Sequence, residues 1–345
     1  MHTEFTTNSL QAVKVWSKLL MRETIEQTWL RRLMGKSEKS PIQLVQDLSR
    51  GPGDEVKFDL LLKMQGAGVD GDTQLKGFEE ALRYEQDSLK INQKRNGHAC
   101  KPMTQQRTLH DLRMDAKSNL AQWFAEKLDR YTFAYLAGTA GTGTDNVAAE
   151  LPFAGNALQT PDADHVWDTT TTASLSDISK LKEAARMASP RIRPCMVDGT
   201  EHYVLILHPY AETALRIEAG ADGWTEIQAR AGARGKDNPI FRGALGVYDN
   251  VVLHSSIYVP ETVGSRVHNL FLGAQAGVIG FGRSYSALGH PAMGSGEHFS
   301  WFEDIEDYGN IRGIAAGAIF GVKKVRFNAK DFGVIRYDTT DAAHT

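Results

Sequence analysis

The chain has 345 residues, which is enough for about two domains and a sizeable hydrophobic core. Its 41% hydrophobic and 23% charged residues are typical of a soluble globular protein, and a net charge of −3 with scattered lysines and arginines argues against sequence-specific nucleic-acid binding. Two cysteines are too few for a disulfide framework, and no signal peptide or membrane-length apolar run is present, so we expect a cytoplasmic protein.

The N-terminal region is predicted to be mainly helical. Apolar residues at helical spacing predict a helix over residues 9–34 that ends at Gly35. A polar linker follows at 36–40, and residues 41–50 fit either a helix or an extended segment. We expect residues 1–50 to form an arm that reaches away from the body.

A long hairpin is predicted next, over residues 54–97. Its outgoing strand alternates apolar and mostly charged residues, which is the period-two pattern of a half-buried strand. Four glycines and four acids between Gly66 and Glu80 predict a solvated tip. In the returning strand, 81–95, the apolar positions change from even to odd numbers, which indicates a bulge or a bend. The outgoing apolar face consists of Val56, Phe58, Leu60, Leu62 and Met64.

This apolar face needs a covering partner, because a two-stranded ribbon is at best marginally stable in water. The partner is either the chain's own core or a neighbouring subunit. The residues leave both alternatives open.

The hairpin leads into a long amphipathic helix, predicted between Thr108 and Gly138. Thr108 and Asp111 have the spacing of an N-terminal capping box, and Gly138 is a suitable C-terminal stop. At about 1.5 Å per residue, the stretch between these caps is roughly 40 Å long. Its apolar stripe consists of Leu109, Leu112, Ala116, Leu120, Phe124, Leu128, Tyr131 and Tyr135.

The remaining chain predicts a mixed α/β domain. A glycine and threonine run at 138–146 marks a domain boundary or a surface excursion. A helix is expected at 176–188, and the apolar run 203–207 predicts a strand buried on both faces, followed by a helix through Arg216. Closing strands are expected within 311–340.

Motifs that suggest ligand binding lack the residues that the chemistry needs. Residues 66–71 match the glycine pattern of a dinucleotide-binding loop, but no helix opens after the third glycine. Residues 138–146 lack the lysine of a phosphate-binding loop. Asp70 and Asp72 lack the rest of a calcium-binding loop.

The candidate catalytic residues also lack the spacing and the neighbouring residues that catalysis needs. His290, Glu297 and His298 lie in a glycine-rich stretch without zinc-site spacing, and Ser284 lacks the second glycine of a nucleophile elbow.

An acid and base pair made of His208 with Asp111 or Asp115 has nothing to orient it. We therefore predict no catalytic, cofactor-binding or metal-binding residue, and a structural protein rather than an enzyme.

Six strings, taken together, resemble the major capsid protein family of the N-four-like tailed bacteriophages. The likeness runs in order from about Gly53 to Thr340, and the first 50 residues match least. The strings are Gly53 to Phe58, Gly71 to Glu80, Leu207 to Tyr210, Asn238 to Gly246, Leu270 to Ala276, and Asp307 through Lys324.

The resemblance implies an α+β protein with the Hong Kong 97-type capsid fold. Residues 1–50 would be the N-terminal arm and 51–100 the extended loop, whose hairpin lies over a neighbouring subunit. Residues 101–170 and 301–345 would form the peripheral domain, with the spine helix at 104–137, and residues 171–300 the axial domain.

The function implied is that of a major capsid protein, whose pentamers and hexamers form an icosahedral head shell around phage double-stranded DNA. The implied location is the virion, after assembly in the bacterial cytoplasm, and DNA would be contacted without sequence preference. Scaffold, portal and decoration proteins are further implied partners. No membrane contact and no cofactor are expected. Cross-linking of a loop lysine has no basis at Lys76, so we expect non-covalent assembly.

The predicted inter-subunit assembly residues lie on the extended loop, and a second set of residues marks the spine helix. Two alternatives to a capsid stay open: an encapsulin-like compartment of the same fold, and a cytosolic α/β enzyme that binds a nucleotide at the Gly66 loop. The loop residues are Val56, Phe58, Leu60, Leu62, Asp70, Asp72, Lys76, Glu79 and Glu80, and the spine-helix residues are Leu109, Leu112, Leu120, Phe124, Leu128 and Tyr131.

Overall fold

The computed structural model describes most of the chain, and its elements run from α1 to β18. The described residues are 10–45, 55–61, 68–72, 74–81, 84–107, 111–142, 158, 165–197, 199–218, 244–262, 266–282 and 298–341. The helices are α1 (Leu10–Gln27), α2 (Pro102–Arg107), α3 (Leu112–Ala137), α4 (Leu175–Met187) and α5 (Pro209–Glu218), with 3-10 helices η1 (Trp29–Leu33) and η6 (Asp307–Gly309).

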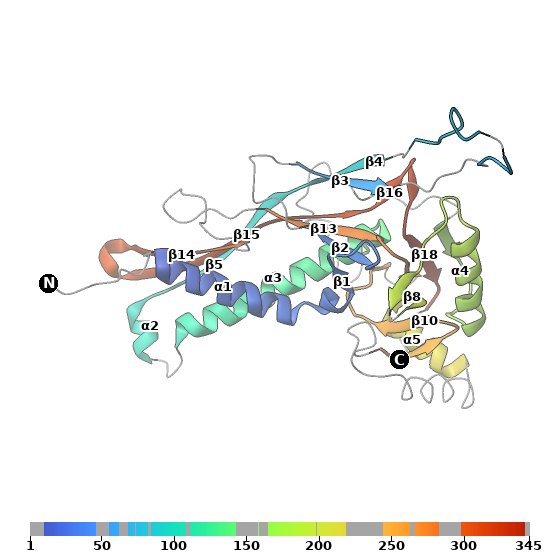
Figure 1. Ribbon diagram of the computed structural model, residues 1–345. Coiled ribbons are helices and arrows are strands. Elements are labelled where there is room, and N and C mark those ends of the chain that lie inside the picture. Colours follow the sequence, from blue (N-terminus) through green and yellow to red (C-terminus); the bar gives the residue numbers. More distant parts are fainter. Residues whose placement is uncertain are drawn as a thin grey trace.

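The first sheet is built around the long strand β15. One edge of β15 pairs with β14 and then with β13, and its other edge pairs with β5. Helices α1 and α3 lie side by side along one face of this sheet (Figure 1). The strands are β1 (Met34–Gly35), β2 (Ile42–Val45), β5 (Asn92–Cys100), β13 (Gly277–Phe281), β14 (Phe299–Glu306) and β15 (Ile311–Lys324), in the order β1-β2-β13-β15-β14.

The second sheet has the order β6-β18-β12-β8-β10-β9, with β7 on β8 and β11 on β12. Helices α4 and α5 pack against one of its faces. Its strands are β6 (Val166–Asp168), β7 (Cys195–Val197), β8 (Thr200–Leu207), β9 (Gly246–Tyr248), β10 (Val251–Ser255), β11 (Glu261–Thr262), β12 (Arg266–Leu272) and β18 (Val334–Thr339).

Two short ribbons complete the described strands. β3 (Glu55–Leu61) pairs with β4 (Tyr84–Lys90), and β16 (Arg326–Phe327) pairs with β17 (Lys330–Asp331). The second ribbon lies in the link between β15 of the first sheet and β18 of the second.

Strand β8 confirms the prediction of a strand buried on both faces. Its residues 203–207 are all buried. Leu205 packs with α4 and α5, whereas Val204 and Ile206 pack into the core that contains α3. One strand therefore joins the two halves of the hydrophobic interior.

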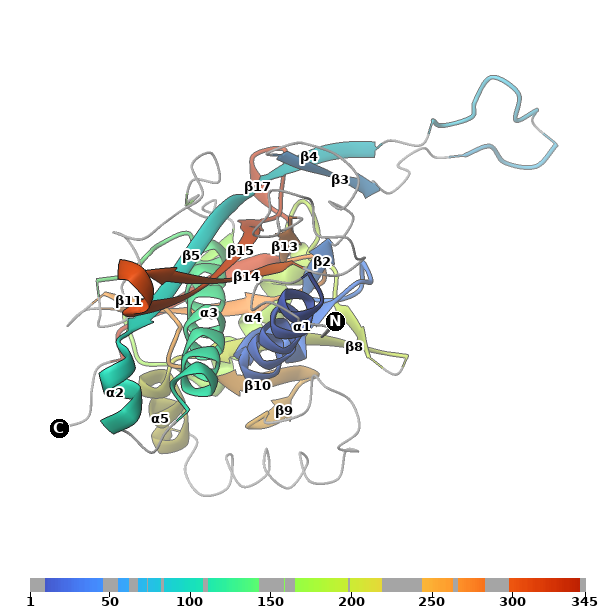
Figure 2. The same cartoon turned by 90° about the vertical axis from the view of Figure 1, so that its left-hand side faces the viewer.

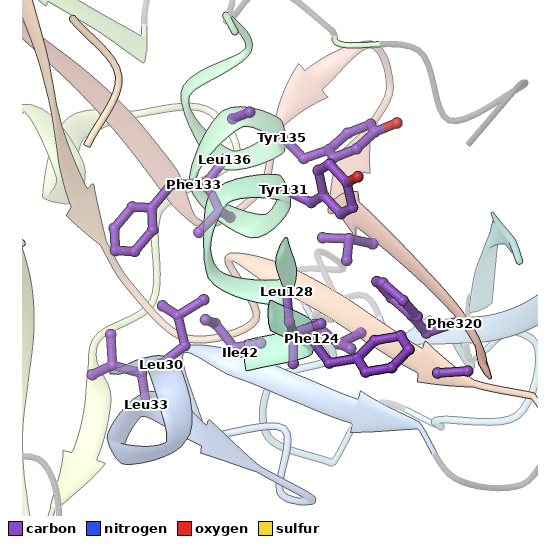
Figure 3. Packing of buried hydrophobic residues seen from close by; sticks show 14 of the residues in the cluster. Leu30, Leu33, Ile42, Phe124, Leu128, Tyr131, Phe133, Tyr135, Leu136 and Phe320 are labelled. Atoms are coloured by element: carbon purple, nitrogen blue, oxygen red, sulfur yellow. The ribbon is translucent and has the colours of Figure 1, made fainter. Parts of the chain in front are cut away.

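Helix α3 supplies the centre of the larger core. Figure 3 shows Phe124, Leu128 and Tyr131 of this helix lying towards Phe320 of β15, while Phe133 lies on the side of Leu30. The helix thus packs against both the first sheet and the N-terminal segment, as its apolar stripe predicts.

The predicted helix over 104–137 is divided in two. Asp111 has extended backbone angles and caps α3, because its carboxylate accepts the backbone N–H of Arg113 at 3.0 Å. Asp111 is thus the N-cap itself, and not the residue three positions after a cap at Thr108, which lies outside the described residues. Gly138 ends the helix in the left-handed conformation, as predicted.

The described part of the N-terminal region packs on the body and does not reach away from it. Helix α1 lies along α3 and β14, and the Trp16 ring stacks on that of Trp301 at 5.6 Å. Strand β2 then pairs with β13 in the first sheet. The expectation of a free arm fails here because the apolar face of the helix finds its partner within the same chain.

The strand pairing also departs from the predicted domain bounds. Strand β13 lies within the expected axial segment 171–300, yet it pairs in the first sheet. Strand β18 lies within the expected peripheral segment 301–345, yet it pairs in the second. Sheet membership depends on the crossings of the chain, which local sequence does not record.

The returning arm of the hairpin breaks, but not where its change of apolar parity predicts a bulge or bend. Strand β4 keeps a regular register with β3 from Tyr84 to Lys90, across that change. Ile91 separates β4 from β5, and the chain changes partner at this point, from β3 to β15. The break at Ile91 therefore marks where the hairpin leaves the first sheet.

Candidate assembly interface

The predicted hairpin is present as β3 and β4. The strands pair antiparallel from Glu55 opposite Lys90 to Leu61 opposite Tyr84. In Figures 1 and 2 the ribbon lies above the first sheet, and the described part of its tip extends away from the body. A protruding ribbon of two strands gains little stability from its own hydrogen bonds, so its contacts decide its role.

The base of the hairpin is buried by the chain's own body. Leu89 is fully buried and is the register partner of Val56. At this point the chain covers its own hairpin, which was one of the two alternatives. The residues packed with Leu89 are Val278, Val325 and Phe332.

Polar contacts hold the same base to β15. The Lys323 ammonium forms an ion pair with Asp87 and donates a hydrogen bond to the carbonyl oxygen of Ser88 at 2.9 Å. Gly321 lies so close to the hairpin that a Cβ there would stand 2.2 Å from the carbonyl oxygen of Lys90. The hairpin therefore leaves the body at a fixed place.

The remaining apolar face stays a prediction. Val56, Phe58 and Leu60 lie on β3, but their side chains are outside the described part of the chain, and Leu62 is outside it altogether.

The predicted loop charges are solvated, as expected of a wet tip. The Glu79 carboxylate accepts the backbone N–H of Gly77 at 2.7 Å, and this hydrogen bond lowers the pKa of Glu79. Charges of both signs thus lie at the tip, available to a partner. The exposed set is Asp70, Asp72, Lys76 and Glu79, and Glu80 is half-buried.

The tip also presents two large apolar side chains that the sequence reasoning missed. Leu75 is 54% exposed and Phe78 is 67% exposed. A turn closed by a 3.0 Å hydrogen bond from the Phe78 N–H to the Leu75 carbonyl sets their positions, with Gly77 at a φ of +98°. Their presence in an otherwise polar, glycine-rich segment was the signal available in the sequence.

The spine-helix residues serve the interior of the subunit. Leu112 is half-buried, and Leu109 lies outside the described residues. The buried members of this set therefore build the core of the subunit. The fully packed members are Leu120, Phe124, Leu128 and Tyr131.

A buried carboxylate on this helix ties the N-terminal segment to it. Asp129 is 2% exposed and accepts the backbone N–H groups of Trp29 at 2.8 Å and Leu30 at 3.1 Å. Burial raises the pKa of Asp129 to about 7, although the two N–H donors and Arg32 act in the opposite direction. The signal for it in the sequence was an acid within the apolar stretch of a helix.

The groove beside this carboxylate has a volume of about 650 Å³. Arg32 and Glu126 bring charges of both signs to its lining, and Ile257 brings an exposed apolar side chain. The described part of the chain holds no group of three or more metal-ligating side chains. Within the same residues, no helix is long and apolar enough to cross a membrane.

The histidine and serine candidates form no catalytic arrangement in the described residues. His298 is buried, stacks on Phe281 at 5.2 Å, and has a pKa lowered by burial. Ser284, His290 and Glu297 lie outside the described residues.

The carboxylate recorded beside the His208 ring is that of Glu261, with 3.9 Å between His208 Nε2 and Glu261 Oε2. The backbone N–H of His208 binds the side chain of Asn269, and its ring packs on Tyr210, whereas Asp111 caps α3. Of the dinucleotide-like stretch, the described residues 68–72 end in a turn, and no helix follows there.

Comparison with known proteins decides the family. The model of a family described as phage capsid protein matches residues 4–343. The chain belongs to this phage capsid protein family. A major capsid protein of Pseudomonas phage KPP25 is 29% identical to it, over 97% of this chain and 96% of that protein.

Solved capsid structures share the fold of this capsid protein. The capsid of Ralstonia phage GP4 matches with a TM-score of 0.82 and 32% identity, over 92% of each chain. The capsid of cyanophage Pam1 matches with a TM-score of 0.65 and 19% identity, over 100% of this chain and 95% of that one, which supports the fold alone. The predicted α+β capsid fold, the family and the capsid function are thereby confirmed.

Proposed function

We propose that this capsid protein assembles by laying its β3–β4 hairpin over a neighbouring copy, in pentamers and hexamers that close an icosahedral shell around double-stranded phage DNA. The family match supports a shell around a genome, in preference to an encapsulin-like compartment or a nucleotide-binding enzyme. A purely structural role, without catalysis, is part of this proposal.

The observation that carries the hairpin's role is the contrast between its base and its tip. The base is buried and tethered by Lys323, whereas Leu75 and Phe78 at the tip are uncovered. A soluble subunit gains nothing from exposing two large apolar side chains on a protruding loop, but a copy beside it can bury them. The tip charges would then disfavour wrong registers.

The domain roles are also part of this proposal, and the fold shared with the capsid of Ralstonia phage GP4 supports them. The first sheet with α1 and α3 corresponds to the peripheral domain, and the second sheet with α4 and α5 to the axial domain around capsomer centres. Assembly in the bacterial cytoplasm, and help from scaffold, portal and decoration proteins, belong to the same proposal.

Deletion of residues 66–80 tests the hairpin. We expect a soluble, folded subunit that forms no shells by electron microscopy and sediments as a small species. A matched control replaces the same segment by glycine and serine residues of equal length, which separates the loss of side chains from the loss of chain length. Normal shells from both variants would contradict the proposal.

A further inference from the structure

The end of β14 and the first residue of η6 carry four acids, among which Asp304 and Glu306 form no ion pair with any described residue. Four of the five residues in 303–307 are acidic. Glu303 is held within the subunit, because it accepts a hydrogen bond from the Arg113 guanidinium at 2.8 Å. Asp304 and Glu306 are exposed, and neither forms an ion pair with another described residue.

Uncovered apolar side chains accompany these acids. Ile305 is 58% exposed, and the Tyr308 ring is fully exposed. Asp307 and Tyr308 both have a φ of +52°, a backbone conformation that costs free energy for residues other than glycine. The turn therefore holds an aromatic ring in solvent on an unfavourable backbone, which brings no benefit to an isolated subunit.

The opposite edge of the same sheet is basic. No acidic residue occurs between Ser88 and His110, a stretch that forms β5 and α2. Arg95 and Lys101 are exposed, and no ion pair joins either of them to another described residue. Met103, at the start of α2, is 55% exposed. In the described part of the chain, no strand pairs with the outer edge of β5, whose nine residues are half-buried or exposed.

Strand pairing places these charges on one face of the sheet. Gly317 of β15 is the register partner of both Ser300 and Arg95, and Asp304 lies four residues after Ser300 on the same face. Trp301 lies on the opposite face, where it stacks on α1. Asp304 and Arg95 thus share the face turned away from the helices.

Within one chain β15 lies between β14 and β5, and no ion pair among the described residues joins Asp304 or Glu306 to Arg95 or Lys101. Charges of opposite sign on opposite edges, on a shared face, match each other when a second copy lies beside the first. The contact joins different surfaces of identical chains, which is the type of contact that closes rings.

We propose that the β14–η6 edge of one copy docks on the β5–α2 edge of a second copy, with Asp304 and Glu306 facing Arg95 and Lys101. This contact rests on the proposed self-assembly and adds to it a pairing that the hairpin does not make. The fully exposed Tyr308 is then covered by the partner's α2 edge, near Met103.

Charge reversal tests the pairing. One variant carries Asp304→Lys with Glu306→Lys, a second carries Arg95→Glu with Lys101→Glu, and a third combines all four. We expect each double variant to reduce the assembled fraction at least tenfold, as measured by sedimentation velocity and electron microscopy. We expect the variant with all four substitutions to restore assembly, because opposite charges then face each other again.

A matched control reverses Lys36 and Lys39, two exposed lysines between β1 and β2, and assembles as the unaltered protein does. Circular dichroism confirms that every variant is folded. This pairing would be overturned if the double variants assembled normally. It would also be overturned if the variant with all four substitutions folded but did not regain the assembled fraction of the unaltered protein. If the unaltered chain and the control form no shells either, alone or with a scaffold protein, the proposed self-assembly itself fails.

Discussion

The spine-helix core and the extended hairpin differ in how much of their apolar surface the chain itself covers. Along α3, every residue from Tyr131 to Ala137 is buried. On the hairpin, Leu89 at the base is buried, while Leu75 and Phe78 at the tip are exposed. The core is therefore complete within one subunit, whereas the apolar side chains of the hairpin tip are left for the neighbouring copy that we propose.

This difference in coverage indicates that different residues control the stability of the subunit and its assembly. Substitutions in the core change the free energy of unfolding of the subunit, and substitutions at the tip change association with little effect on folding. Stability is best measured on the variant without residues 66–80, which we expect to remain unassembled.

The largest effect is expected in the core. Phe124→Ala removes a buried ring that meets the Phe299 ring edge-on at 5.1 Å, so we expect a loss of about 3–5 kcal/mol in the free energy of unfolding. Urea denaturation measures it, with Gln122→Ala on the exposed face of α3 as the control. An effect no larger than that of the control would show that this helix is not the centre of the core.

The next effect is a pH dependence from Asp129. Its pKa is raised to about 7 in the folded state, so the folded protein binds more protons than the unfolded chain between pH 4 and 7. The stability contributed by this group is present below pH 4 and is lost as the pH rises through 7. The loss is on the order of 2–4 kcal/mol. Glu126 and Arg32 are the charged groups that act on this carboxyl.

Asp129→Asn separates this slope from that of other groups. The variant keeps one acceptor oxygen but does not titrate, so the difference in unfolding free energy between the two proteins changes across pH 4 to 7. A constant difference over this range would contradict the buried, protonated carboxyl.

A smaller, local effect is expected where the two regions join. Lys323→Met removes the ion pair with Asp87 and the hydrogen bond to Ser88, which both lie in a largely buried setting. We expect amide exchange in β3 and β4 to become easier by about 1–2 kcal/mol, while α3 is unaffected. Lys39→Met, at an exposed site, serves as the control. Equal loss of protection in α3 would show that the hairpin and the core open together.

The smallest effect on folding is expected at the tip. Phe78→Ser changes a side chain that is 67% exposed, so the free energy of unfolding should change by less than about 0.5 kcal/mol. The assembled fraction should nevertheless fall, because the partner loses an apolar contact. Gln74→Ser, an exposed polar residue beside the same turn that is not among the predicted assembly residues, controls for a general effect of tip substitution. Unchanged assembly of the Phe78 variant would remove this ring from the interface.

The candidate site was predicted unevenly. Strand alternation and the glycine-rich tip placed the hairpin, and the charged tip residues are exposed as expected. Leu75 and Phe78 were missed, because an apolar residue in a turn can equally fold back onto the body. Asp129 was missed for a different reason: the backbone N–H groups that its carboxylate accepts lie about 100 positions away in the sequence.

By itself, the sequence determined the elements whose physics is local. The hairpin follows from period-two alternation, the end of α3 from Gly138, and the buried strand β8 from a continuous apolar run. Only the tertiary structure decided that β13 and β18 exchange sheets relative to the expected bounds, that α1 packs on α3, and that β15 separates a basic edge from an acidic one. These outcomes depend on which distant segments bury one another, and that competition is resolved only when the whole chain is folded.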